Sequence, residues 1–310
     1  MSHLGQITLP PADAPVLDVA PPARTHRRNR IALYARRYLR NRMAVVGLGI
    51  FALLVAFAVF GAVLTPYGPT DTDFTAMGEG PSAAHWFGTN DVGTDLFTQT
   101  VHGMRRSLII ALTVSLATTV IAAVVGATAA FLGGLGERLI LGLINFLLIL
   151  PTFLILALLS SKSGGNWQVL IVVLIVTGWM TQARVVWSLS TSLRERDYVT
   201  AARFMGVSGL TNVVRHIIPN IGSLLVVNFA FGVATTVMAE TGLSFLGFGV
   251  KIPDVSLGTL LGDGIGSIFV APWRFYFPAG ILTLLTVSMA FVSDGLRDAL
   301  DPNSAAGGRA

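Results

Sequence analysis

Residues 194–220 read RERDYVTAARFMGVSGLTNVVRHIIPN, and long apolar segments lie on both sides of this polar stretch. Four of its residues recur at i, i+3, i+4 and i+7 and therefore share one helix face: Tyr198, Ala201, Ala202 and Met205. The two alanines make that face shallow, and Gly206 is suited to end the helix in the left-handed conformation. The pattern predicts a short helix near 194–206 with a surface that another backbone can approach.

The flanks of this predicted helix carry their own signals. Ser192 and Glu195 have the spacing of a capping box, which predicts that the helix begins there. A second helix is expected to begin around Ser208 or Thr211, and Pro219 marks the entry to the next apolar segment. The residues alone leave two interpretations open, an ordinary amphipathic interfacial helix or a docking helix.

The composition of the chain points to a lipid environment. Of its 310 residues, 53% are hydrophobic and 12% are charged, with a mean hydropathy of +0.70, whereas soluble domains have about 25% charged residues. The absence of cysteine excludes disulfides, thiolate metal sites and a cysteine nucleophile. The basic residues adjoin apolar segments, so we expect them to set membrane topology and expect no nucleic-acid partner.

The N-terminal region divides into two parts. Residues 1–23 contain five prolines and are predicted to form a disordered tail without a cleaved signal peptide. Residues 24–42 contain eight arginines and are predicted to form a basic juxtamembrane helix on the anionic cytoplasmic surface.

Six segments are long and apolar enough to cross a hydrocarbon core, which takes about 20 helical residues. They lie near 43–65, 108–132, 139–160, 168–187, 221–239 and 278–295. Pro151 should kink the third span, and the spacing of Ala122, Gly126 and Ala130 predicts a close helix contact in the second. Residues 240–277 are rich in Gly and Pro, and either a re-entrant segment or a surface loop fits them.

The distribution of basic residues predicts the orientation of these spans. With the N-terminus inside, 16 of the 21 Lys and Arg residues fall in cytoplasmic segments, which is the pattern of the positive-inside rule. Both termini and the stretch 194–220 are therefore expected in the cytoplasm, and 66–107 is expected to form an extracytoplasmic loop.

The sequence contains no motif for chemistry of its own. It has no GxxxxGK[ST], no HExxH and no metal-ligand spacing among its five histidines, and GLGIFA at 47–52 lies inside an apolar span. Away from their ends the spans carry no Asp, Glu, Lys or Arg, although ion-coupled carriers keep such groups near the midplane. We therefore expect no enzyme activity, cofactor or metal, and expect transport energy to come from elsewhere. A self-sufficient channel or secondary carrier is the alternative, followed by an intramembrane enzyme.

The stretch 194–220 resembles the coupling-helix motif of permease subunits of ATP-binding-cassette (ABC) importers. The motif's two alanines, glycine and proline correspond to Ala201, Ala202, Gly206 and Pro219, while Thr200 stands in place of its glutamate and His216 with Ile218 replaces its Ile and Leu. With these departures, the stretch is similar to the corresponding stretch of the dipeptide/oligopeptide/nickel permeases.

Three further blocks resemble the same subfamily. They are HWFGTNDVGTDLFTQTVHGMRRSL at 85–108, AETGLSFLGFGVKIPDVSLGTLL at 239–261 and DGLRDALDP at 294–302. The blocks resemble its C-type subunit more than the B-type partner. In the first block Asn90, Thr94, Thr98 and Gln99 replace residues that are often Asp, Arg, Ser and Arg, so no role of those residues is carried over.

The resemblance implies an all-α, polytopic membrane helix bundle with the type I ABC importer permease fold: six transmembrane helices, a core permease domain over 108–302 and a C-terminal tail over 303–310. It also implies a multi-pass protein of the bacterial cytoplasmic membrane. The implied partners are a B-type permease subunit in a heterodimer, two cytoplasmic ABC ATPase subunits that bind ATP–Mg, an extracytoplasmic substrate-binding protein and membrane lipid. The cargo stays open among dipeptides, oligopeptides, nickel and other solutes.

The resemblance further implies functional residues. The expected ATPase-docking residues of the coupling helix are Asp197, Tyr198, Ala201, Ala202, Arg203 and Gly206. For Glu240, which closes the fifth span, three roles remain open: lining the outer gate, contacting the binding protein, or being an ordinary interfacial carboxylate. Substrate-lining residues cannot be named from the sequence.

Overall fold

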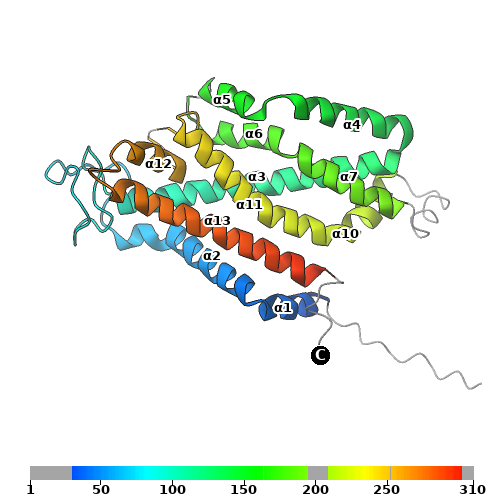
Figure 1. Ribbon diagram of the computed structural model, residues 1–310, viewed down its shortest axis with the longest axis horizontal. Helices are drawn as coiled ribbons and strands as arrows, with labels where there is room; N and C mark the ends of the chain where they lie inside the picture. Colours follow the sequence, from blue (N-terminus) through cyan, green and yellow to red (C-terminus); the bar gives the residue numbers. More distant parts are fainter. Residues whose placement is uncertain (1–29, 163, 195–208, 252, 302–310) are drawn as a thin grey trace, which may run out of the picture.

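The computed structural model describes residues 30–162, 164–194, 209–251 and 253–301, and the elements of this described part are helical (Figure 1). Most helices run along one axis and form a bundle. They are α1 (Arg30–Arg40), α2 (Arg42–Phe60), α3 (Leu96–Leu132), α4 (Gly134–Ile149), α5 (Thr152–Lys162), α6 (Trp167–Gly178), α7 (Met180–Arg194), α9 (Gly209–Asn212), α10 (Ile218–Asn220), α11 (Gly222–Phe245), α12 (Leu257–Ile265) and α13 (Trp273–Leu300). A 3₁₀ turn (Gly61–Leu64) follows α2, and a π-helix (Val213–Ile217) joins α9 to α10.

The predicted number of spans is confirmed for the described residues. Five helical segments there are long and apolar enough to cross a membrane, and α4 with α5 makes a sixth if the pair is one span. The pair bends by 75° at Leu150 and Pro151, because proline cannot donate to the preceding turn and clashes with it. The predicted kink at Pro151 is therefore confirmed.

Some predicted boundaries are wrong, and the second span shows why. Asp95 caps α3, because its Oδ1 accepts from the Thr98 amide at 2.7 Å, so residues 96–107 are helical rather than part of the predicted loop 66–107. Arg105 and Arg106 lower the hydropathy of that segment, so the apolar run that predicted the span begins only after them. Residues 240–277 likewise contain the end of α11, all of α12 and the start of α13.

The capping box predicted at Ser192 is also wrong. Helix α7 continues through Ser192 to Arg194, and the Ser192 hydroxyl donates to the carbonyl of Leu189 at 2.8 Å. A serine within a helix often bonds back to the preceding turn in this way, so its spacing from Glu195 carried no information on where a helix begins.

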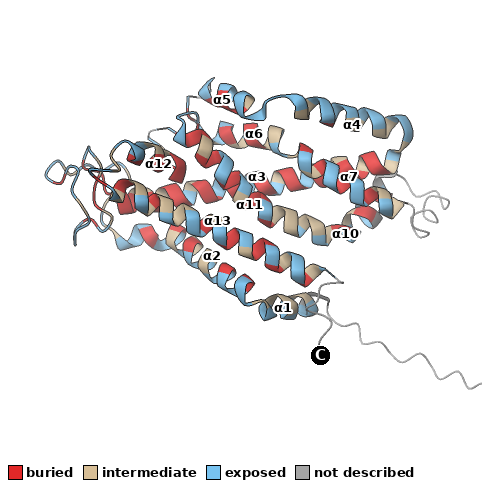
Figure 2. Ribbon diagram, viewed as in Figure 1, coloured by how far each residue is buried: buried red, intermediate tan, exposed pale blue. Residues whose placement is uncertain are grey.

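Helix α3 lies at the centre of the bundle, and much of it is buried (Figure 2). Its neighbour α7 approaches closely because α3 presents small residues there: a Cβ added to Gly126 would stand 2.4 Å from the carbonyl oxygen of Ala183. Ala122 and Ala130 are fully buried. The close contact predicted from the spacing of these three residues is confirmed.

Gly126→Val should therefore separate α3 from α7. We expect it to lower the free energy of unfolding by about 1–3 kcal/mol, the usual cost of overpacking, measured by thermal unfolding of the purified protein in detergent. Gly142→Val on α4 is the matched control, because a Cβ there meets nothing within 4 Å. Equal stability of the two variants would contradict the contact.

Helix α2 packs against α13, so the first and last spans of the described part lie side by side. A Cβ at Gly47 would stand 2.6 Å from the Cβ of Phe291, so GLGIFA at 47–52 is a helix-packing segment. Asn41 separates the predicted basic helix, α1, from α2: its Oδ1 caps α2 and its Nδ2 donates to Asp298 at 3.0 Å.

The bundle has two chemically different ends (Figure 1). One end gathers α1, the last turns of α7 and α13, and α9 with α10; the other carries loop 65–95, α12 and the first turn of α13. The first end holds most of the described arginines: Arg36, Arg37, Arg40, Arg42, Arg138, Arg194, Arg215 and Arg297. The segments that the positive-inside rule assigns to the cytoplasm therefore lie at the same end of the bundle.

Candidate functional site

The predicted docking residues lie outside the described residues. Asp197, Tyr198, Ala201, Ala202, Arg203 and Gly206 all fall within 195–208, so their roles stay predictions. The structure does describe the helices on both sides of that stretch.

On the N-terminal side, the end of α7 is fastened to the turn between α3 and α4. Arg194 donates to the carbonyl of Ala130 at 2.7 Å and lies 3.6 Å from a Glu137 oxygen. The indole of Trp187 donates to the other Glu137 oxygen at 2.8 Å. The last described residue before the stretch 195–208 is therefore held firmly against α3 and α4.

On the C-terminal side, the chain re-enters the bundle through α9, the π-helix and α10. The predicted second helix is confirmed, because α9 begins at Gly209, and Pro219 lies in the first turn of α10. Val213, Ile217 and Ile221 are buried in one cluster with Ala127 and Val186. These short elements lead directly into α11, so a displacement of 195–208 can reach α11 without crossing a long loop.

Glu240 lies near the opposite end of α11 and is buried, with 1% of its surface exposed. Its Oε1 accepts from the Ser244 hydroxyl at 2.6 Å, and its Oε2 accepts from the Ser107 hydroxyl at 3.2 Å. The carboxylate thus joins α11 to α3 and does not lie at a surface in this conformation. Its role at a gate or in contact with another protein stays a prediction.

The same network reaches α12. Ser107 accepts a hydrogen bond from the amide of Leu257 at 3.2 Å, and Ser256 with Thr259 forms a capping box at the start of that helix. Glu240, Ser107 and the N-terminus of α12 therefore form one lock, which holds α3, α11 and α12 together.

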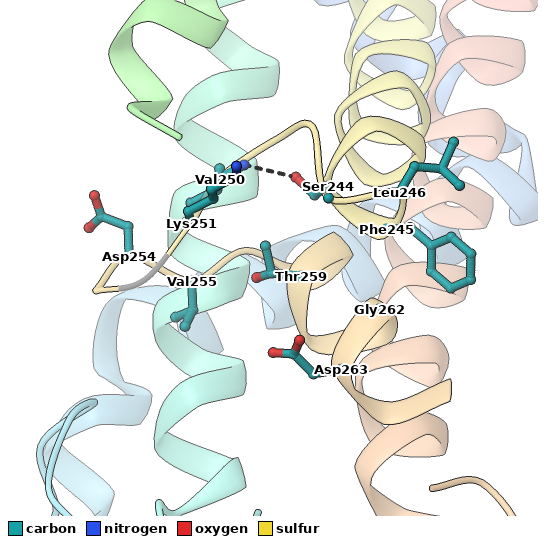
Figure 3. Close-up of a pocket in the computed structure, with 11 residues that line it drawn as sticks. Ser244, Phe245, Leu246, Val250, Lys251, Asp254, Val255, Thr259, Gly262 and Asp263 are labelled. Atoms are coloured by element: carbon teal, nitrogen blue, oxygen red, sulfur yellow. Dashed lines mark hydrogen bonds between the residues drawn. The ribbon is translucent and has the colours of Figure 1, made fainter. Parts of the chain in front are cut away.

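A pocket of about 590 Å³ opens beside this lock, between the end of α11 and α12 (Figure 3). Its charged lining residues are Lys251, Asp254 and Asp263, and Thr259 projects from α12 beside Asp263. The amide of Val250 donates to Ser244 at 3.2 Å and closes one wall (Figure 3). Desolvation raises the pKa of the Asp263 carboxyl above its ordinary value, and the charge of Arg274 opposes that rise. The volume is in the range of small-molecule sites.

Loop 65–95 is built around a buried histidine. The Nδ1 of His85 donates to Asp95 Oδ2 at 2.9 Å, and its Nε2 lies 3.8 Å from an oxygen of Asp73. Two hydrogen bonds from Thr75 hold the pKa of the exposed Asp73 carboxyl below its usual range. Gly93 has φ +81° and passes so close to Asp73 that a Cβ would overlap it. The loop is therefore a folded unit on top of α3.

The same loop is fastened to α13. Arg274, which is 6% exposed, donates to Asp91 Oδ1, and the indole of Trp273 donates to the carbonyl of Thr89 at 3.4 Å. These contacts could not be predicted from the sequence, because they join residues more than 180 positions apart. The only sequence signal was the block 85–108.

Asp95→Ala should release this loop from α3. The change removes the cap of α3 and leaves His85 without its carboxylate, so we expect a loss of about 2–4 kcal/mol in the free energy of unfolding. Thermal unfolding in detergent measures it. Glu79→Ala, in the same loop but with an exposed side chain, is the control; equal melting of the two variants would contradict the assignment.

A second pocket, of about 220 Å³, lies between α3, α5, α6, α7 and α11. Several of its lining residues, Thr152 and Thr235 among them, are exposed. It is lined by five threonines, one glutamine and several apolar or small residues. Its polar residues are Thr118, Thr152, Thr177, Gln182, Thr235 and Thr236. No Asp, Glu, Lys, Arg or His of the described ranges lines it, and the same ranges contain no group of three His, Asp or Glu residues that could hold a metal ion.

These features define a polytopic α-helical membrane protein with an uncharged polar pocket between its helices and a folded loop at one end. Two known families match parts of the chain. The family described as "Binding-protein-dependent transport system inner membrane component" matches residues 119–305. The family described as "N-terminal TM domain of oligopeptide transport permease C" matches residues 29–81.

Curated relatives cover nearly the whole chain. The oligopeptide transport system permease protein OppC of Mycobacterium tuberculosis is 45% identical over 278 residues, 89% of this chain and 96% of the relative. OppC of Bacillus subtilis is 33% identical over 266 residues, 86% of this chain and 87% of the relative. A putative peptide permease protein of Brucella suis is 36% identical over 278 residues, 88% of this chain and 91% of the relative.

The chain belongs to the family of binding-protein-dependent transport system inner membrane components. It is a multi-pass permease subunit of an ABC importer in a bacterial inner membrane. The predicted helical membrane fold, permease family and localisation are thereby confirmed, the orientation of the termini stays a prediction, and the secondary-carrier alternative is not favoured.

Proposed function

We propose that this chain is the C-type permease subunit of an oligopeptide importer. The observation that carries the proposal is the 45% identity to an oligopeptide permease over 89% of the chain. In this proposal the chain pairs with a B-type permease, receives peptide from an extracytoplasmic binding protein, and contacts two ATPase subunits that alone bind ATP–Mg and hydrolyse it.

The proposed orientation places the end that carries α1, α9 and α10 in the cytoplasm. Its arginines support this, because cytoplasmic flanks are rich in Lys and Arg. Residues 195–208 then face the ATPase subunits, and Tyr198, Ala201, Ala202 and Gly206 form the docking face, with Asp197 and Arg203 as flanking charges. Loop 65–95 and the pocket beside α12 then face the binding protein.

In the proposed cycle, ATP binding closes the ATPase subunits and displaces the coupling helix. Since Val213, Ile217 and Ile221 pack against α3 and α7 and lead into α11, that displacement moves α11 relative to the bundle. Alternating access then follows from two arrangements of packed helices whose relative stability ATP changes.

The test is reconstitution of the chain with its permease and ATPase partners in liposomes. We expect uptake of radiolabelled oligopeptides that requires ATP, both ATPase subunits and the peptide-loaded binding protein. Dipeptides and Ni²⁺ are assayed in parallel with their own loaded binding proteins. Peptide uptake by this chain alone without ATP would contradict the proposal, and import of Ni²⁺ but no peptide would contradict the cargo.

A further inference from the structure

We infer that the threonine-lined pocket between α3, α5, α6, α7 and α11, called the central cavity below, is a subsite that binds the backbone of a peptide in transit. This inference rests on the proposed function. It adds which groups of the chain hold the peptide and which part of the peptide they bind.

Three of the five threonine hydroxyl groups of this cavity are arranged as acceptors. Thr118 donates to the carbonyl of Val114 at 2.9 Å, Thr177 to that of Val173 at 2.9 Å, and Thr235 to that of Gly232 at 3.1 Å. A hydroxyl has one hydrogen to donate and two lone pairs that accept. Since each hydrogen is engaged by the threonine's own helix, each oxygen offers lone pairs to the cavity. The donor that every peptide carries is its backbone N–H.

Gln182 supplies a donor on the same wall. Its Oε1 accepts from the Thr119 hydroxyl at 3.5 Å, which leaves the Nε2 of the amide to donate. Gly232 lies next to it, and a Cβ there would stand 3.5 Å from Nε2. The amide can therefore bind a peptide carbonyl, the acceptor that pairs with the N–H of the same backbone.

The charge of the cavity differs from that of the pocket beside α12. That pocket presents Lys251, Asp254 and Asp263, whereas the described lining of the central cavity carries no ionisable side chain. An uncharged wall favours neither acidic nor basic side chains. A subsite of this kind binds the backbone groups that all peptides share and accepts side chains that differ between peptides.

The size of the cavity limits how much it holds. At about 220 Å³ it is smaller than the roughly 300–1,000 Å³ of sites for drug-sized ligands, so it takes one residue and its adjoining peptide groups. Plain packing of these helices would be served by apolar side chains, whereas five threonines and a glutamine line this pocket.

The first experiment removes two acceptors and compares two peptides. Thr177→Val with Thr235→Val preserves side-chain shape, and the reconstituted complex is assayed with an unmodified peptide and with its backbone N-methylated counterpart. We expect the double variant to lower uptake of the unmodified peptide roughly tenfold, since it loses two hydrogen bonds, and to leave uptake of the N-methylated peptide unchanged. ATPase activity stimulated by the loaded binding protein should persist.

The matched control is Thr283→Val with Thr286→Val on α13. Both of these hydroxyls also donate to their own helix, at 2.8 Å and 3.0 Å, but they do not line the cavity. The control should transport both peptides as the wild type does. Equal losses for the two peptides, or no loss in the double variant, would overturn the subsite while leaving the importer intact. Failure of the wild type to import any peptide would instead overturn the proposed function, and the subsite with it.

A second variant tests the charge argument. Gln182→Glu places a carboxylate in the uncharged wall at nearly constant shape. We expect uptake of acidic peptides to fall roughly tenfold more than that of basic peptides of equal length, because a like charge at close range in a low dielectric is repelled. Indifference to peptide charge would show that Gln182 does not face the substrate and would overturn its assignment.

Discussion

Ala202→Glu is expected to abolish ATP-driven uptake while leaving the chain inserted in the membrane. The substitution puts an unpaired carboxylate on the shallow face that is predicted to enter a cleft of the ATPase. Burying such a charge at an interface costs about 2 kcal/mol or more, which weakens docking about 30-fold or more. The measurements are uptake in proteoliposomes and recovery of the ATPase subunits on affinity purification.

Two further variants sharpen this prediction. Ala202→Ser keeps the residue small and uncharged and should transport as the wild type does. Gly206→Asp should uncouple like Ala202→Glu, because an aspartate disfavours the left-handed turn that glycine permits. Full transport by a complex that carries Ala202→Glu would rule out the docking assignment.

Glu240→Ala is expected to have the largest effect on stability. It removes the acceptor of both Ser107 and Ser244 in a fully buried site and leaves a void among α3, α11 and α12. The expected loss in the free energy of unfolding is about 3–5 kcal/mol, together with loss of uptake. Thermal unfolding in detergent and transport in liposomes measure the two effects.

Glu240→Gln separates the hydrogen bonds from the charge. The amide has nearly the same shape and can still bond both serines, so we expect it to retain most of the stability and to assemble. If Glu240→Ala melts with the wild type and transports peptide, the lock between the three helices has no energetic role.

The spans were predictable from the sequence because hydropathy is a local property. In the described part of the chain five of the six segments are found as single helical spans, and the sixth is found if α4 and α5 form one span. The kink at Pro151 and the contact at Gly126 followed from single residues. Helix ends were less predictable, because they depend on caps. Asp95 starts α3 twelve residues before the apolar run, and Ser192 imitates a cap inside α7.

The sites were less predictable, because they are assembled from distant parts of the chain. Glu240 was identified, but its partner Ser107 lies 133 residues away, and nothing local announces the pair. The threonines of the central cavity are spread over four helices, and Thr118, Thr177 and Thr235 bond back to their own helices as ordinary residues do. Only their convergence makes them a candidate site.

Helix α11 has a further consequence for how the molecule works. Its 24 residues extend for about 36 Å and join the re-entry point of the coupling stretch, the central cavity and the Glu240 lock. Because α11 is one continuous helix with three attachments, a movement at one of them is passed on to the other two. In the orientation and cycle proposed above, a small rotation imposed at the α10 end of α11 would change the shape of the cavity and strain the hydrogen bonds of Glu240 at the other end, so one helix would couple the release of the peptide to movements at both ends.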